Sequence, residues 1–128
     1  MDIRVSGHQV ETGEALRGHV DARLRGADRK YSARLVSSQV TFGKGPHDHG
    51  FTVEIVAYAP QGAVLKATER GAEARSAFDA AAEKVEKQMR RLMRKVKDRR
   101  AGDPAELLET VGDAEYRRGE DASGPDEG

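Results

Sequence analysis

The sequence has no cysteine and no tryptophan, and its aromatic residues are three tyrosines and three phenylalanines. The absence of cysteine excludes a disulfide framework, a thiolate zinc site and a thiol nucleophile. No run of apolar residues approaches the ~18 that a transmembrane helix requires, and no basic-then-apolar start indicates a signal peptide. We therefore expect a cytoplasmic protein with a single small core.

Charge is unevenly distributed, although the formal net charge is zero. Residues 1–100 carry 20 Lys and Arg against 13 Asp and Glu, a net +7, whereas residues 101–128 carry two against nine, a net −7. Residues 1–83 are balanced at 11 against 11, so the positive excess lies in residues 84–100. That run contains two acids and nine basic residues: Lys84, Lys87, Arg90, Arg91, Arg94, Lys95, Lys97, Arg99 and Arg100.

This imbalance predicts a polyanion as partner, most often nucleic acid. A helix that is merely solvated usually alternates charge signs to gain pairs four residues apart, and this one does not. Because aromatic residues are scarce, a platform that stacks single-stranded bases is disfavoured. Contacts to the backbone and shape of structured RNA fit the composition better, and they predict binding that weakens steeply with salt.

Hydrophobic periodicity predicts six elements. Alternation with period two indicates strands at 2–6, 35–42, 51–58 and 63–69. Apolar residues spaced three and four apart indicate helices at 12–30, with Thr12 as N-cap, and at 72–100.

The order β-α-β-β-β-α predicts an α+β fold, a two-layer sandwich. The link through a helix favours parallel pairing of the first two strands, and the short later links favour antiparallel hairpins. Each strand has one apolar face, so both helices should cover the same side of a four-stranded mixed sheet. The folded domain is expected at 1–100, followed at 101–128 by an acidic flexible tail or linker with a short helix at 104–111.

The candidate site is cationic. On the second helix, helical spacing places two flanks of basic residues beside the apolar stripe. One flank holds Lys84, Lys87, Arg91 and Lys95, and the other holds Arg90, Arg94 and Lys97. The first helix adds five cations, offset by the acids Glu14, Asp21 and Asp28, and on the same side of the sheet they would line a second edge of one cationic groove: Arg17, Arg23, Arg25, Arg29 and Lys30.

Catalysis has no support in the sequence. The run His47-Asp48-His49 lacks the spacing of a zinc site, and Gly43-Lys44-Gly45 lacks the length and the Ser or Thr of a phosphate loop. Glu54 and Glu69 read as surface carboxylates on the open face of the sheet. We expect no enzyme, no metal site, no cofactor and no small-molecule substrate.

The chain resembles a known family over residues 1–100. The resemblance lies in Ile3-Arg4-Val5-Ser6-Gly7 and in Glu14-Ala15-Leu16-Arg17 followed by His19-Val20. It lies above all in Ala77-Phe78-Asp79-Ala80-Ala81-Ala82-Glu83-Lys84-Val85-Glu86-Lys87-Gln88-Met89-Arg90-Arg91. These segments are similar to the ribosome hibernation-promoting factors, a family that includes the ribosome-associated inhibitor and is also called the sigma-modulation proteins.

The resemblance implies a fold like a double-stranded-RNA-binding domain with an extra strand. It also implies binding to ribosomal RNA in the messenger RNA and tRNA channel of the small subunit, in whole ribosomes, with inhibition of translation during stress or stationary phase. The family's contacts carry over to Arg17, Arg23, Lys30, Lys84, Lys87, Arg91 and Lys95. Arg90, Arg94 and Lys97 extend this set by charge and spacing only.

Two features depart from the family. Arg75 stands three residues before Phe78, where the family usually has an aromatic residue. The chain also lacks the strand patterns of the C-terminal dimerisation domain of long members, so it is a short form or a long form cut in its linker, and the resemblance implies dimers only with that domain. Two other functions stay open: a general structured-RNA-binding module, and a protein-interaction module whose basic helix docks an acidic partner.

Overall fold

The computed structural model describes residues 1–98, and the six expected elements follow one another in the expected order. They are β1 (Asp2–Gly7), α1 (Glu14–Tyr31), β2 (Ser37–Lys44), β3 (Phe51–Tyr58), β4 (Val64–Gly71) and α2 (Ala74–Asp98), with short 3-10 turns at Pro46–Asp48 and Pro60–Gly62 in the two hairpin loops. The predicted tail at 101–128 and its helix at 104–111 lie outside the described residues.

The four strands form one mixed sheet in the order β1-β2-β3-β4. β1 pairs with β2 in parallel, whereas β2, β3 and β4 pair antiparallel, as the lengths of the connections predict. The register sets Val5, Val40, Ile55 and Ala67 opposite one another in a row across the sheet. Side chains alternate between the two faces of a sheet, and the apolar side chains of this row share one face, which is the apolar side.

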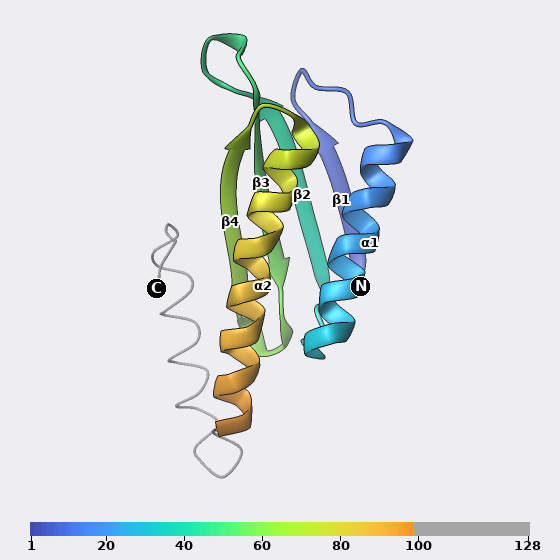
Figure 1. Cartoon of the computed structure of the whole chain (residues 1–128). Helices are drawn as coiled ribbons and strands as arrows, with labels where there is room; N and C mark the ends of the chain where they lie inside the picture. The colour runs from blue at the N-terminus through green and yellow to red at the C-terminus, as the bar shows by residue number, and fades with distance from the viewer. Residues whose placement is uncertain (99–128) are drawn as a thin grey trace.

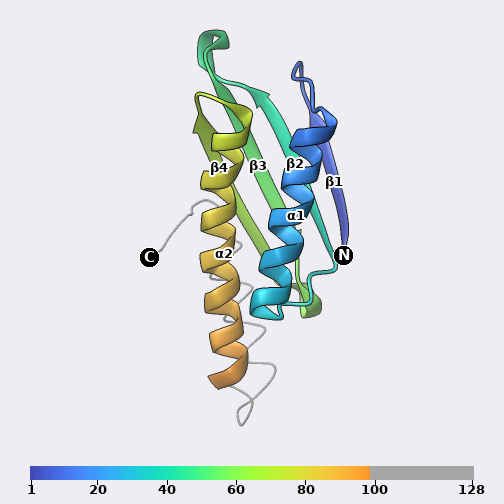
Figure 2. The same cartoon turned by 45° about the vertical axis from the view of Figure 1, so that its right-hand side comes forward.

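Both helices cover that apolar side and lie side by side, α1 over β1 and β2, and α2 over β3 and β4 (Figures 1 and 2). They run in the same direction, and the last turns of α2 extend past the end of the sheet. The largest fully buried side chains include Leu24 of α1, Phe42 and Ile55 of the sheet, and Phe78 and Met89 of α2. The two-layer α+β prediction is therefore confirmed.

Two local predictions are wrong. The N-cap of α1 is Gly13 rather than Thr12. Gly13 has an extended backbone conformation just before the first turn, and no side chain caps the helix. Thr12 instead accepts hydrogen bonds from Arg17. Alternation along the predicted strand 35–42 puts Val36 on the same face as Val40 and Phe42, but Val36 is 60% exposed, because the strand begins only at Ser37, two residues later than predicted.

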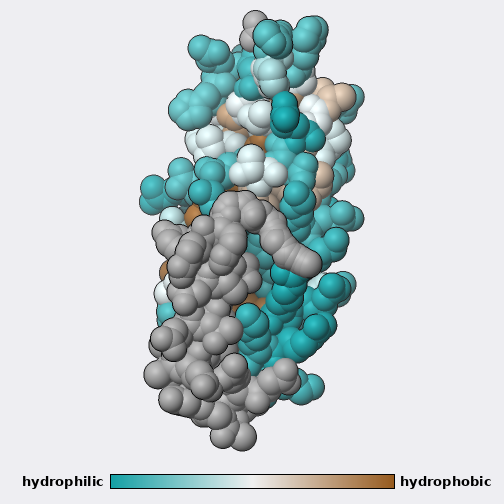
Figure 3. All heavy atoms as spheres, turned by 90° about the vertical axis from the view of Figure 1, so that its left-hand side faces the viewer, coloured by the Kyte–Doolittle hydropathy of each residue, from teal (hydrophilic) through white to brown (hydrophobic). Residues whose placement is uncertain are grey.

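The described surface on the β4 side is mostly hydrophilic, with small separate apolar patches (Figure 3). Neither helix described in the structure is long and apolar enough to cross a membrane. Within residues 1–98, no three His, Cys, Asp or Glu side chains lie close enough together to hold a metal ion.

Candidate nucleic-acid interface

The basic run predicted from the sequence occupies the second half of α2. Its apolar stripe is docked, since Val85 and Met89 are fully buried and Leu92 is 8% exposed. The cations occupy the remaining sides of the helix. Lys84, Lys87, Arg90, Arg94 and Lys97 are exposed, and Arg91 and Lys95 are half-buried. Arg99 and Arg100 lie outside the described residues.

One flank of α2 faces β4. Lys84 Nζ forms an ion pair with Glu69 of β4, so Glu69 does not lie on the open face as predicted. It follows Leu65 and Ala67 on the face toward α2, since side chains two residues apart share a face of the sheet. The charge of Lys84 is therefore partly offset by a carboxylate of the sheet.

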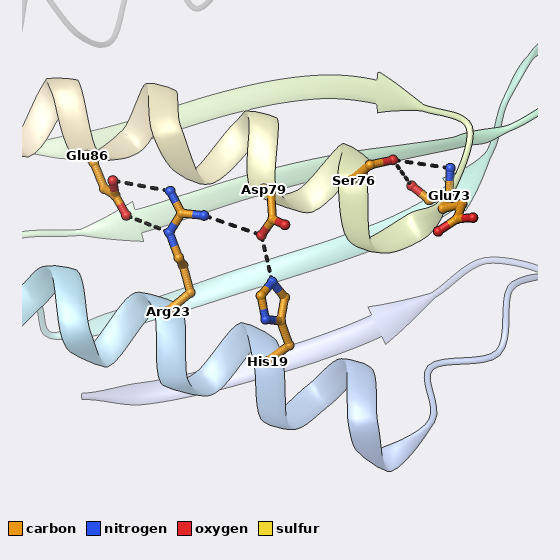
Figure 4. A network of polar contacts seen from close by, with 6 residues as sticks. All are labelled: His19, Arg23, Glu73, Ser76, Asp79 and Glu86. Atoms are coloured by element: carbon orange, nitrogen blue, oxygen red, sulfur yellow. Dashed lines mark hydrogen bonds and ion pairs between the residues drawn. The ribbon is translucent and has the colours of Figure 1, made fainter.

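The other flank of α2 faces α1 through a polar network (Figure 4). Arg23 Nε donates to Glu86 Oε2 over 2.8 Å, and Nη2 donates to Glu86 Oε1 over 3.3 Å. Arg23 Nη1 also donates to Asp79 Oδ1 over 3.3 Å. The side chains of Arg23 and Glu86 are only 29% and 24% exposed, so this guanidinium is enclosed between the helices.

The electrostatics of this network hold Arg23 in its charged form. The hydrogen bond that Arg23 donates to Glu86, together with the negative charges of Glu86, Asp79 and Glu83, raises the pKa of Arg23 against the opposing effect of partial burial. Asp79 Oδ1 also lies 2.6 Å from His19 Nε2, and the His19 ring packs edge-on against Phe78 with centroids 5.6 Å apart. Two residues of α1 and two of α2 thus form one connected set of polar contacts.

The remaining candidates on α1 lie at its two ends. Arg17, in the first turn, donates from Nε to the Thr12 carbonyl over 3.0 Å and from Nη2 to Thr12 Oγ1 over 3.1 Å. Lys30, in the last turn, has its Nζ 5.3 Å from the centre of the Tyr31 ring. Both side chains are on exposed residues, but only Lys30 lies at the end of the helix pair where the cations of α2 gather (Figure 2).

Seven of the ten predicted site residues fall into two groups. Arg23 and Lys84 are held by carboxylates of the domain itself. Within residues 1–98, five other cations of α2 take part in no ion pair: Lys87, Arg90, Arg94, Lys95 and Lys97. The structure thus concentrates unpaired positive charge in the second half of α2 rather than along a groove between the helices.

Sequence reasoning missed the acidic half of the network between the helices. Asp79 and Glu86 are seven residues apart, which is two helical turns, and they meet His19 and Arg23, which are one turn apart. The available signal was Glu86 itself, an acid in the basic run, on the flank opposite Lys84 and Arg91. Its partner could be assigned only once the two helices were known to be adjacent.

The sequence of this domain matches known proteins over most of its length. The family model described as "Sigma 54 modulation protein / S30EA ribosomal protein" matches residues 3–97. A ribosome hibernation promotion factor of Rhizobium meliloti (strain 1021) is 38% identical over 102 residues, which cover 80% of this chain and 53% of the relative. The factor of the same name from Bradyrhizobium diazoefficiens is 34% identical over 101 residues, or 79% of this chain and 49% of the relative. The chain thus spans about half the length of the curated relatives it matches.

Solved structures share the fold. The Protein Y N-terminal domain of Thermus thermophilus superposes with a TM-score of 0.62 at 26% identity, covering 71% of this chain and 98% of that domain. A ribosomal subunit interface protein from Coxiella burnetii gives a TM-score of 0.60 at 20% identity, over 70% of this chain and 93% of that structure, and supports the fold alone. Because the family match extends over residues 3–97, this chain belongs to the Sigma 54 modulation protein / S30EA ribosomal protein family.

Proposed function

We propose that this chain is the ribosome-binding part of a ribosome hibernation factor. It binds the small ribosomal subunit, alone and within whole ribosomes, by placing α2 against ribosomal RNA in the channel used by messenger RNA and tRNA. It inhibits translation during dormancy or stress by occupying that channel, without catalysis. Family membership and the names of the two curated relatives support the ribosome as partner.

One observation carries the RNA-binding part of this proposal. The cations of the second half of α2 lie on a helix whose apolar stripe is buried from Val85 to Leu92 and partly buried at Val96, and five of them have no carboxylate partner within the described residues. Releasing counterions from RNA phosphates favours binding by such a surface. If five phosphates are neutralised, the affinity falls by about two to three orders of magnitude between about 50 and 200 mM salt.

The test is co-sedimentation with purified ribosomes, small subunits and large subunits in sucrose gradients at low and high salt. A variant with Lys87→Glu, Arg94→Glu and Lys97→Glu should lose binding to the small subunit while keeping its fold by circular dichroism. The matched control reverses three exposed cations outside α2 that form no ion pair within residues 1–98, Arg34, Lys44 and Arg70, and so changes the net charge equally.

The outcomes separate the candidate functions. Salt-sensitive, saturable binding to small subunits that only the α2 variant loses supports the proposal. Equal loss in both variants would mean that net charge alone drives association. Equal affinity for small subunits and for a plain RNA duplex would leave a general structured-RNA-binding module, and binding that survives nuclease treatment would indicate an acidic protein partner.

A further inference from the structure

The two edges of the sheet differ in how their outward backbone groups are satisfied. At the β4 edge, the Ala59 N–H donates to the Ala63 carbonyl over 2.8 Å. The alternation of an antiparallel ladder then turns the backbone N–H and C=O of Lys66 away from β3. Gln88 of α2 meets both of these groups. The Lys66 N–H donates to Gln88 Oε1 over 2.9 Å, and Gln88 Nε2 donates to the Lys66 carbonyl over 2.8 Å. A side chain thus occupies the third residue of this edge strand, where an added strand would pair.

Within residues 1–98, no side chain covers the β1 edge in this way. The Asp2 N–H donates to the Val36 carbonyl over 3.2 Å, and the His8 N–H donates to the Phe42 carbonyl over 2.9 Å, so the even-numbered residues of β1 pair with β2. The period of the ladder therefore turns the N–H and C=O groups of Ile3 and Val5 away from the sheet. No element of the described chain lies beyond β1 (Figure 2). Such a row of backbone groups is a template for another strand.

The side chains of β1 suit a strand partner. Ile3 and Val5 lie on the helix side, only partly buried at the margin of the core. On the open face, Arg4 Nε lies 3.3 Å from Asp2 Oδ2, and the two side chains are 79% and 64% exposed. An ion pair so exposed contributes little to stability, so its members exchange partners at low cost.

We propose that β1 is a self-association edge, where a second copy of this chain adds its own β1 in antiparallel orientation. With Ile3 opposite Ile3 of the second copy, the outward groups of both strands face each other. Asp2 then lies opposite Arg4 of the second copy, and Arg4 opposite its Asp2. Twofold symmetry makes this favourable pairing occur twice. The register centred on Arg4 would instead oppose two like charges.

The rest of the molecule is compatible with this arrangement. Val20 and Leu24 turn the core face of α1 to the sheet, while His19 and Arg23 turn to α2. Helical spacing therefore places charges of both signs on the flank toward the β1 edge, so that flank does not present a single sign of charge to a second copy: Glu14, Arg17, Asp21, Arg25 and Asp28. The cations of α2 lie on the far side of α1 and stay accessible. This self-association does not depend on the proposed ribosome binding.

The test is sedimentation equilibrium of the whole chain over a wide range of protein concentration. We expect a monomer–dimer equilibrium. Asp2→Arg alone and Arg4→Asp alone should each raise the dimer dissociation constant about tenfold, because each change acts at two symmetric contacts. The double variant Asp2→Arg/Arg4→Asp restores opposite charges across the dyad and should return the dissociation constant to that of the wild type.

The matched control is Glu54→Arg, which reverses the charge of one member of another exposed ion pair on the open face. That pair joins Lys66 Nζ and Glu54 Oε2 at 3.4 Å. It should leave the dimer unchanged, and circular dichroism would verify that every variant is folded. A chain that stays monomeric at every concentration overturns the proposal. So does a dimer that Asp2→Arg leaves intact, that Glu54→Arg weakens equally, or that the double variant fails to restore.

Discussion

Arg23 of α1 and Glu86 of α2 form a two-point ion pair, with both guanidinium-to-carboxylate contacts within hydrogen-bond distance. The sequence predicts that Arg23 is one of the RNA-binding cations, yet its positive charge is largely neutralised by carboxylates of the domain itself. The pair joins the two helices. It also removes positive charge from the middle of the helix layer, which leaves the unpaired cations in the second half of α2.

Arg23→Gln should lower the free energy of unfolding by about 1–3 kcal/mol, the range for hydrogen bonds to charged groups that are partly buried. Arg25→Gln is the matched control, because Arg25 pairs with Asp21 four residues away on the exposed surface of the same helix. That change should cost about 0.5 kcal/mol or less. Urea denaturation measures both. Equal losses would show that the contact between the helices contributes no more stability than the exposed pair of Arg25 and Asp21. A double-mutant cycle with Glu86→Gln would measure the coupling energy of Arg23 and Glu86 directly.

The contribution of Arg23 should not depend on pH in the neutral to alkaline range. Its pKa is raised on folding, and a group with a raised pKa adds stability below its unfolded pKa and loses it only as the pH rises through the folded value. Both values lie beyond ordinary alkaline conditions for a guanidinium. The difference in unfolding free energy between wild type and Arg23→Gln should therefore stay constant from about pH 7 to pH 10.

An Arg23→Lys variant provides the contrast, because an unperturbed lysine amine has a pKa of about 10.4. Its advantage over Arg23→Gln should persist up to about that value and shrink only as the pH rises above it, through the higher pKa of the paired amine in the folded state. Denaturation curves at several pH values would measure both differences. A wild-type advantage that declines across the same range would be inconsistent with a charged Arg23 in the folded state.

Lys84 and Lys87 should contribute unequally to RNA binding, although they lie one turn apart on α2. Lys84 is paired with Glu69, whereas Lys87 has no ion-pair partner in the described part of the chain. Lys87→Gln should reduce the slope of log affinity against log salt by about one unit, the expectation for one lost phosphate contact. Lys84→Gln should change it much less.

Glu69→Gln tests the same idea in the opposite direction, because it releases Lys84 and should strengthen binding and steepen the salt dependence. Filter binding or co-sedimentation with small ribosomal subunits at four or more salt concentrations would measure these slopes. Equal slopes for Lys84→Gln and Lys87→Gln would refute the division of the cations into paired and unpaired groups.

Gln88 should protect one amide of β4 from hydrogen exchange. Gln88→Ala removes both bonds to the Lys66 backbone, so the Lys66 amide should exchange faster and the domain should lose about 1 kcal/mol of stability. Gln88→Glu keeps an acceptor for the Lys66 N–H but no donor for its carbonyl. It should therefore destabilise the domain while the amide stays protected, as amide exchange followed by NMR would show. Unchanged exchange in Gln88→Ala would contradict the contact.

The sequence alone determined the element order, the pairing of the strands, the core stripe of α2 and its basic flanks. These features rest on periodicity and on connection lengths, which are local. Strand 51–58 was predicted with its observed bounds, and Phe78, Val85 and Met89, which recur at helical spacing in the predicted helix 72–100, form the buried stripe of α2. A side chain's position along a helix or strand fixes the direction it points relative to its neighbours, so no tertiary information was needed.

Only the tertiary structure decided which charges remain available and which edge of the sheet is open. Arg23 and Lys87 look alike in the sequence, and they differ because α1 lies against Asp79 and Glu86, whereas no carboxylate of residues 1–98 pairs with Lys87. The closing of the β4 edge by Gln88 likewise joins residues 22 positions apart. The free energy of such contacts depends on the partner across space, and helical or strand spacing carries no information about that partner until the layers are packed.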